Sequence, residues 1–197
     1  QRPQPGRDLQ LGLDADLQAL GERLMEGKLG AIVAIEPKTG QVLAMVSSPT
    51  FNPSMMIGKL RGKYQRDLTL DPAKPLLNRA IMGQYPPGST FKTSQAVTYY
   101  TEGIINDSTR YVCNHGFNFK GLHVGCHSHA SPLALVPAIS TSCNGYFCWG
   151  LYHMLSNRKK YKTLDDAMTV WRNYMVSMGF GYKLGIDLPG EKRGMIP

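Results

Sequence analysis

The sequence lacks any long apolar run, which limits the kinds of protein that it can encode. None of its 197 residues belongs to a stretch approaching the roughly 18 apolar residues that a membrane-spanning helix needs. No signal peptide opens the chain either. Because residue 1 is Gln rather than Met, we expect a processed or excised piece of a longer protein, with any membrane anchor lying outside it.

Acidic residues are also scarce, with 14 Asp and Glu against 22 Lys and Arg and a net charge of +8. Such an excess suits nucleic acid, an anionic membrane or an acidic polymer, and equally a solvated surface. One basic cluster comprises Arg158, Lys159, Lys160 and Lys162. Few aromatic residues surround it and no nucleic-acid-binding motif accompanies it, so we expect no nucleic-acid partner.

Internal repeats are absent as well, and the composition is typical of one globular domain of good size. Apolar periodicity and capping signals predict helices, which are expected over residues 14–25, over 89–102, from Pro132, from Asn144, and from the capping box at 163–166 to Gly179. The Met and aromatic stripe of the last helix is interpreted as core. Residues 48–84 are expected to be loop-rich.

Two apolar runs, 31–35 and 42–46, flank a turn at 37–40 and predict a β-hairpin. Both strands are apolar on both faces. Strands of this kind need cover on both sides, usually from helices.

The most informative motif is a serine followed three residues later by a lysine, Ser89 and Lys92, after a Pro-Pro-Gly turn. At the start of a helix this spacing places a hydroxyl and an amine on one face, as a nucleophile and its base. Taken by itself, however, Ser89 is more simply a helix cap. The same pattern recurs at Ser156 and Lys159, in a charged run with no apolar helix after it.

A second group, Ser142-Cys143-Asn144, lies between two predicted helices. A hydroxyl there can relay a proton, and a carboxamide can hold a peptide carbonyl group. As an isolated tripeptide it is again more simply a helix cap.

In this order, Ser-x-x-Lys and Ser-x-Asn resemble the first two motifs of the serine penicillin-recognising enzymes. The runs at 36–46, 78–92 and 185–191 extend the resemblance to the class B penicillin-binding proteins, particularly those of cell elongation. It covers about residues 8–197. The resemblance implies an α/β (α+β) transpeptidase fold like that of serine β-lactamases, with helices on both faces of an antiparallel sheet. Residues 1–12 would form a linker, and 13–197 the N-terminal part of the transpeptidase domain.

The resemblance also implies roles. Ser89 would attack a D-alanine carbonyl of a peptidoglycan stem peptide, Lys92 would take its proton, and Ser142 would relay that proton. Asn144 and Thr90 would contact the substrate. Penicillins and other β-lactams would acylate the same serine, and no cofactor would be needed for catalysis. The expected setting is the periplasmic face of the inner membrane, with a glycosyltransferase and scaffold proteins of cell elongation as partners.

A third family motif, Lys-Thr-Gly or similar, is missing after Asn144. The only Lys-Thr-Gly, at 38–40, precedes Ser89 and falls at the predicted hairpin turn, so we interpret it as a turn. We therefore expect the third motif and the remaining strands to lie beyond residue 197, and these 197 residues alone to be unable to cross-link.

Cysteine and histidine crowd the segment between residues 113 and 129, where four of them could hold a zinc ion tetrahedrally. The preferred set is Cys113, Cys126 and His129, with His127, His123 or His115 as the fourth ligand. The alternative is a Cys113–Cys126 disulfide. The resemblance is consistent with zinc, since some relatives carry it between the first two motifs. Cys143 and Cys148 are interpreted as buried thiols.

Three other functions remain open. An inactive penicillin-binding-like module that binds peptidoglycan or division proteins predicts loss of Ser89 or Lys92, yet both are present. A zinc-dependent interaction module predicts repeated fingers, but the cluster is single. A β-lactamase needs a deacylating base, for which no motif is evident.

Overall fold

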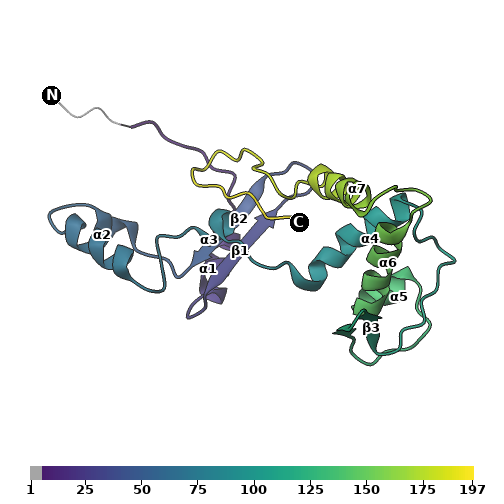
Figure 1. Ribbon diagram of the computed structural model, residues 1–197. Coiled ribbons are helices and arrows are strands. Elements are labelled where there is room, and N and C mark those ends of the chain that lie inside the picture. Colours follow the sequence, from purple (N-terminus) through teal and green to yellow (C-terminus); the bar gives the residue numbers. More distant parts are fainter. Residues whose placement is uncertain (1–5) are drawn as a thin grey trace. The chain divides into compact units, whose positions relative to one another are not determined.

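The computed structural model describes residues 6–197 and contains both helices and strands (Figure 1). Its contacts divide it into two compact units, one up to Gly83 with Ile186–Lys192, the other Gln84–Gly185 with Arg193–Pro197. Residues 6–12 of the expected linker have no regular secondary structure, and residues 1–5 lie outside the described part. Among the described residues, no helix has the length and apolar character needed to cross a membrane.

The first unit is built on a β-hairpin, as the sequence predicted. Its elements are α1 (Ala15–Leu24), β1 (Gly30–Ile35), β2 (Val42–Ser48), η1 (Pro53–Met56), α2 (Arg61–Leu70) and α3 (Arg79–Met82). The two strands are antiparallel, with Ile32 opposite Val46 and an irregularity after Ala34. The Lys-Thr-Gly run forms part of the connecting turn, where Gly40 has a φ of +77°. The interpretation of that run as a turn is thus confirmed.

Helix α1 packs closely on β2. Gly21 is buried there, and a Cβ at this position would lie 2.8 Å from Cγ2 of Val46. The Gln18 side chain adds two hydrogen bonds to the strand backbone. It donates to the carbonyl of Met45 at 3.1 Å and accepts from the N–H of Met45 at 2.8 Å. The helix is therefore fixed to the strand by both packing and polar contacts.

Two expectations for this unit are corrected. In β1 burial alternates along the strand, so Val33 and Ile35 are 42% and 54% exposed. The expectation that both faces of each strand are covered is therefore met by β2 and not by β1. The segment predicted to be loop-rich contains α2 and α3. Helix α2 buries none of its residues, so its sequence carries little apolar periodicity to reveal it.

The second unit is mainly helical. Its elements are η2 (Gly88–Phe91), α4 (Lys92–Thr101), β3 (Gly116–Phe119), β4 (Leu122–Gly125), α5 (Leu135–Ser140), α6 (Asn144–Ser156) and α7 (Leu164–Ser177). The helix predicted from residue 89 is present, with a 3₁₀ first turn. The helix from Asn144 is also confirmed, and so is the capping box, in which Thr163 and Asp166 exchange hydrogen bonds.

The helix expected from Pro132 begins instead at Leu135. Leu133 is held in an extended conformation because its backbone exchanges two hydrogen bonds with Tyr111, at 2.8 and 2.9 Å. A strand-like pair cannot at the same time start a helix. The β3–β4 hairpin was not predicted at all, since its four-residue strands alternate too briefly to give a signal.

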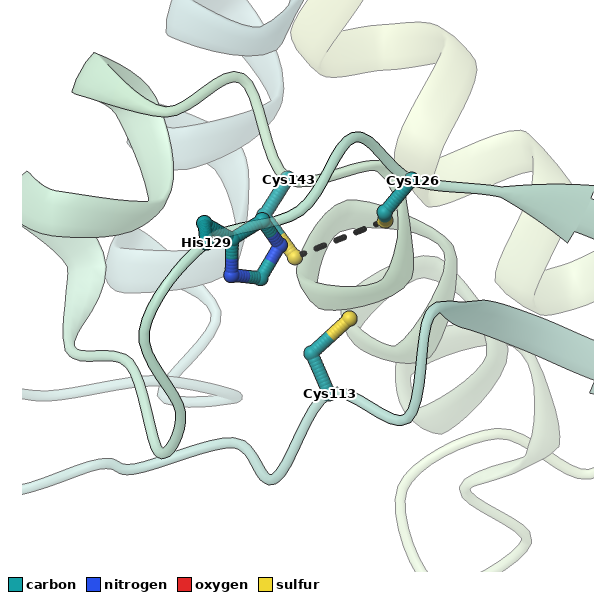
Figure 2. Close-up of side chains that lie close together, drawn as sticks. All are labelled: Cys113, Cys126, His129 and Cys143. Carbon is teal, nitrogen blue, oxygen red and sulfur yellow. Dashed lines mark hydrogen bonds between the residues drawn. The ribbon is translucent and has the colours of Figure 1, made fainter.

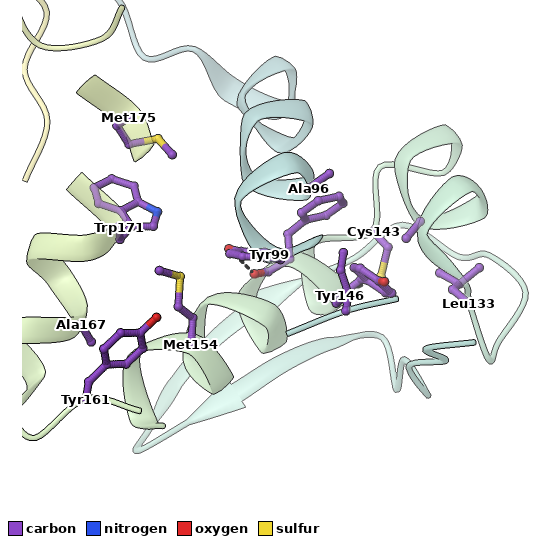
Figure 3. Packing of buried hydrophobic residues seen from close by; sticks show 13 residues of the cluster. Ala96, Tyr99, Leu133, Cys143, Tyr146, Met154, Tyr161, Ala167, Trp171 and Met175 are labelled. Atoms are coloured by element: carbon purple, nitrogen blue, oxygen red, sulfur yellow. Dashed lines mark hydrogen bonds between the residues drawn. The ribbon is translucent and has the colours of Figure 1, made fainter. Parts of the chain in front are cut away.

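Helices α4, α6 and α7 enclose the core of this unit, with Tyr99, Met154 and Met175 among its buried residues (Figure 3). Gly150 allows α6 to approach α4, since a Cβ there would lie 2.6 Å from the ring of Tyr99. The indole N–H of Trp171 donates to Oε1 of buried Gln95 at 3.1 Å, which satisfies both polar groups. The Met and aromatic stripe of α7 is thus core, as predicted.

Candidate active site and adjacent metal site

The four predicted catalytic residues lie together in the second unit. Ser89 is exposed in η2, and Lys92 follows as the first residue of α4. Asn144 is the first residue of α6, and Ser142 precedes it by two residues. Because α4 packs against α6, residues about 50 positions apart in the sequence meet at the N-terminal ends of the two helices.

The Lys92 amine is the centre of this group. Its Nζ lies 3.1 Å from Oγ of Ser89 and 2.6 Å from Oδ1 of Asn144. It also lies 2.8 Å from Oγ and 2.7 Å from the carbonyl oxygen of Ser142. An ammonium has three N–H donors for these four oxygens, whereas a neutral amine has two donors and one lone pair. The contact with Ser89 is the longest of the four. In the neutral amine, the lone pair can therefore face Ser89 and accept the proton of its hydroxyl.

Ser142 completes a triangle with these two residues. Its hydroxyl donates to Oγ of Ser89 at 2.8 Å. The backbone of Ser142 is left-handed, with a φ of +53°, which is uncommon for a residue other than glycine. This conformation places both its carbonyl and its hydroxyl against Lys92, so a proton can pass among the three side chains.

Burial favours the neutral form of Lys92. Desolvation lowers the pKa of its amine from the ordinary value of 10.5, against an opposing effect of negative charge on the thiols of Cys126 and Cys143. The amine also lies 5.9 Å from the centre of the buried Phe147 ring. An amine with a lowered pKa is a better candidate base at neutral pH.

Asn144 connects the Lys92 amine to the neighbouring hairpin. While Oδ1 accepts from Lys92, Nδ2 donates to the carbonyl of Gly125 at 2.7 Å, at the end of β4. Both polar ends of the carboxamide are therefore fixed. Thr90, predicted to contact substrate, uses its hydroxyl to donate to the carbonyl of Pro87 at 2.5 Å. In this structure it stabilises the turn before Ser89.

The second Ser-x-x-Lys match has no such surroundings. The Ser156 hydroxyl donates to the carbonyl of Tyr152 at 2.5 Å, at the end of α6. Lys159 is exposed. Within residues 6–197, no hydrogen bond joins Ser156 to Lys159, so this match lacks the arrangement of a nucleophile and its base.

Beside the catalytic group, four side chains face a common point: Cys113, Cys126, His129 and Cys143 (Figure 2). Their sulfur and ring nitrogen atoms all lie within 4.8 Å of one another. The sulfurs of Cys126 and Cys143 are 3.8 Å apart. Tetrahedral zinc with Zn–S bonds of about 2.3 Å places two sulfurs about 3.8 Å apart, so the spacing fits this metal.

His129 has the orientation of a metal ligand. Its Nδ1 donates to the carbonyl of Ala130 at 2.8 Å, and its Nε2 is buried with no hydrogen-bond partner in the described part of the chain. A histidine ligand typically donates one ring N–H to a carbonyl group and binds the metal through the other nitrogen. The unpartnered Nε2 therefore supports a zinc site made by these four residues.

Three of these four residues were predicted from the sequence, and the fourth was not. His127, His123 and His115 are exposed and lie outside the group, and the fourth position belongs to Cys143. This residue was interpreted as a buried thiol inside a helix. It is fully buried, but it precedes α6 as its N-cap, so its sulfur is free to face the group. Because it lies inside the Ser-x-Asn motif, the sequence did not single it out as a candidate ligand.

The cysteines differ in their ease of ionisation. Burial raises the pKa of the Cys143 thiol to about 12. Burial also opposes ionisation of Cys126, but the hydrogen bond from the Gly145 N–H and the neighbouring His129 ring together outweigh it and lower its pKa. All four cysteines, which lie within the described residues, are free thiols, so the Cys113–Cys126 disulfide is not formed here.

The group around Lys92 and the cysteine cluster are connected through two consecutive residues, Gly125 and Cys126. Gly125 accepts the hydrogen bond from Asn144, and Cys126 accepts one from the N–H of Gly145 at 3.1 Å through its sulfur. Ordering of the cysteine cluster therefore bears directly on the position of the Asn144 carboxamide.

Comparison with known families gives one match over most of the chain. Residues 30–197 match the family described as the penicillin-binding protein transpeptidase domain. The curated relatives include peptidoglycan D,D-transpeptidase MrdA of Acinetobacter baumannii, 36% identical over 99% of this chain. The chain spans 28% of the length of that relative.

Solved structures agree on the fold. Penicillin-binding protein 2 of Pseudomonas aeruginosa, in complex with WCK 5153, has a TM-score of 0.79 and 30% identity, covering 98% of this chain and 42% of its own. A complex between penicillin-binding protein 2 and MreC from Helicobacter pylori gives a TM-score of 0.77 and 27% identity, covering 94% of this chain and 33% of its own.

Proposed function

The chain belongs to the penicillin-binding protein transpeptidase family, and we propose that the protein is a peptidoglycan D,D-transpeptidase of cell-wall elongation, of the penicillin-binding protein 2 type. The observation that carries this proposal is the contact of one half-buried amine, that of Lys92, with Ser89, Ser142 and Asn144. An inactive binding module would need none of these contacts.

In the first half of the reaction, Oγ of Ser89 attacks the carbonyl of the penultimate D-alanine of a donor stem peptide. Lys92 in its neutral form accepts the serine proton. The bond to the terminal D-alanine breaks, and its amine leaves with a proton passed through Ser142. The product is an ester between Ser89 and the donor, and Asn144 is positioned to hold the donor's amide group.

In the second half, an amine from a neighbouring stem peptide attacks this ester. Its proton goes to the Lys92 and Ser142 pair, Oγ of Ser89 recovers a proton, and a new amide bond cross-links the two peptides. A β-lactam ring would acylate the same oxygen. Because no amine is released from the opened ring, the enzyme would remain acylated.

The reaction needs no cofactor. A structural zinc ion is proposed at Cys113, Cys126, His129 and Cys143, where it would stabilise the polar loop that carries Gly125. By analogy with the Helicobacter pylori complex, an MreC-like scaffold protein is proposed as a partner. An elongation glycosyltransferase is proposed as a second partner, because a similar solved structure is of a peptidoglycan synthase complex that coordinates polymerization and crosslinking. The proposed location is the periplasmic face of the inner membrane.

The direct test uses the full-length product of the gene, a synthetic donor pentapeptide ending in D-Ala-D-Ala, and an amine acceptor. We expect release of one D-alanine for each amide bond formed, measured by mass spectrometry. A penicillin added first should stop both the release of D-alanine and the formation of the amide bond. Release of D-alanine without an amide product would indicate a carboxypeptidase instead, and binding of the donor without release would indicate an inactive module.

A pH profile tests the role of Lys92. Because burial lowers its pKa, the neutral amine becomes available at a pH below the ordinary 10.5. The rate of acylation by a β-lactam should therefore rise with pH through a midpoint below 10.5, and be lost as the pH falls below that midpoint. Lys92→Arg should abolish this rise of the acylation rate with pH, because arginine stays protonated. A wild-type profile that is flat from pH 5 to 10 would contradict this role.

A further inference from the structure

A hollow lies along the C-terminal half of α6, whose N-terminal end carries Asn144. It has a volume of about 600 Å³ and is lined by the turn after α4, by Trp149 and His153 of α6, and by Arg158 and Lys159 beyond the helix. The α6 residues that line it follow Asn144 by five residues at Trp149 and by twelve at Ser156, or about 8 to 18 Å along the helix at 1.5 Å per residue. The hollow is thus separate from the site around Ser89, although one helix reaches both.

The hollow is positively charged. Arg158 and Lys159 are exposed, and in the described part of the chain neither forms an ion pair. The nearby carboxylate, that of Glu102, is already occupied by Lys160 and by the hydroxyls of Tyr161 and Tyr174. A negatively charged ligand would therefore find cations in the hollow that have no competing carboxylate.

Arg158 is also held in place. One of its terminal nitrogens donates to the carbonyls of Leu155 and Thr163, at 2.9 and 3.3 Å. This fixes the guanidinium against the backbone. Its other nitrogens form no hydrogen bond within residues 6–197, and they remain available for a carboxylate.

The wall of the hollow is aromatic. The rings of Trp149 and His153 lie 4.6 Å apart between centroids, and the ring of Tyr111 lies 5.7 Å from that of Trp149. The indole is held by two neighbouring rings and is only half-buried, so its exposed part can contact a sugar ring or an apolar side chain. The hollow therefore combines an aromatic face with cations, and both suit a ligand that has rings and carboxylates.

We propose that this hollow is an accessory binding site for acidic peptidoglycan, taking the carboxylates of a stem peptide on Arg158 and Lys159 and an adjoining sugar or side chain on Trp149. This proposal rests on the proposed transpeptidase function, which makes a glycan strand with acidic peptides the substrate. A site along the C-terminal half of α6 would hold part of the polymer while another stem peptide occupies Ser89.

The test is fluorine NMR of the full-length protein labelled with 5-fluorotryptophan, titrated with the soluble disaccharide–tetrapeptide that a muramidase releases from peptidoglycan. We expect the Trp149 signal to shift, and the signal of Trp171, which is buried in the core, to stay in place. W149F assigns the first signal. The disaccharide without its peptide, and inorganic phosphate, should each shift it far less.

Charge reversal gives matched variants. Lys159→Glu should weaken binding of the fragment about tenfold, because it places a repelling charge in the hollow. Lys162→Glu makes the same change in the same basic run but outside the lining, and should alter affinity less than twofold. Equal affinities in the two variants, no shift of the Trp149 signal, or an equal shift with phosphate would overturn the proposal.

Acylation of the wild-type protein by labelled penicillin is measured separately. If the wild-type protein is not acylated, the proposed function is contradicted. The affinity of the hollow for the fragment is still given by the titration.

Discussion

Ser89→Ala is expected to abolish covalent labelling by a fluorescent penicillin, with a loss of at least about a thousandfold in the acylation rate. The reason is that Oγ of Ser89 is the only hydroxyl in contact with both Lys92 and Ser142 among the described residues. Without it no ester can form, and the remaining groups cannot replace a nucleophile. Labelling is measured by gel fluorescence and by the mass of the intact protein.

The matched control is Ser156→Ala, in the other Ser-x-x-Lys match of the chain. Its hydroxyl donates only to the carbonyl of Tyr152, so labelling should be unchanged. The melting temperature of both variants shows whether either has lost its fold. If Ser89→Ala were labelled at the wild-type rate in a folded protein, the assignment of the nucleophile would be wrong and Ser89 would be a helix cap.

Removal of the proposed metal is expected to have the second large effect. The purified protein should contain about one zinc ion per chain, and stripping it with a strong chelator should lower the melting temperature by on the order of 10 °C, since structural zinc contributes several kcal/mol and 1 kcal/mol corresponds to about 2–4 °C in a domain of this size. Acylation should slow as well, because the Gly125 carbonyl that orients Asn144 lies next to Cys126.

Cys143→Ala should reproduce the effects of chelation, whereas Cys148→Ala should not. Both remove a thiol close to the core of the same unit, but only Cys143 belongs to the group of four. Zinc is measured by mass spectrometry and stability by calorimetry. Less than half an equivalent of zinc, together with a Cys113–Cys126 disulfide in a peptide map, would show that the cluster is a redox pair and not a metal site.

Local patterns in the sequence were sufficient for much of the fold. The helices at Ala15, Lys92, Asn144 and Leu164 were predicted from apolar spacing and capping residues, and the β1–β2 hairpin from its two apolar runs. Elements without such signals were missed. Helix α2 buries nothing, and the start of α5 was misplaced because a long-range backbone pair between Tyr111 and Leu133 keeps the chain extended.

The candidate catalytic residues were predictable one motif at a time, since each motif is short. The sequence placed Ser89 three residues from Lys92, and Ser142 two from Asn144. It could not show that the two motifs meet, because that depends on α4 packing against α6 through Gly150 and Tyr99. From the sequence, only the resemblance to a family indicates that the two motifs share one site.

The groups available for chemistry can therefore be read directly from the amino-acid order: a serine with a lysine beside it, a serine and asparagine to assist, and a cluster of thiols and imidazoles. The tertiary structure decided how these groups are used. It brought Lys92 within 3.1 Å of three other side chains, placed Cys143 as the fourth member of the proposed metal group, and left Ser156 without a base. The physical reason is that hydrogen bonds and metal ligation act over about 3 Å, whereas packing of whole helices determines which residues come that close.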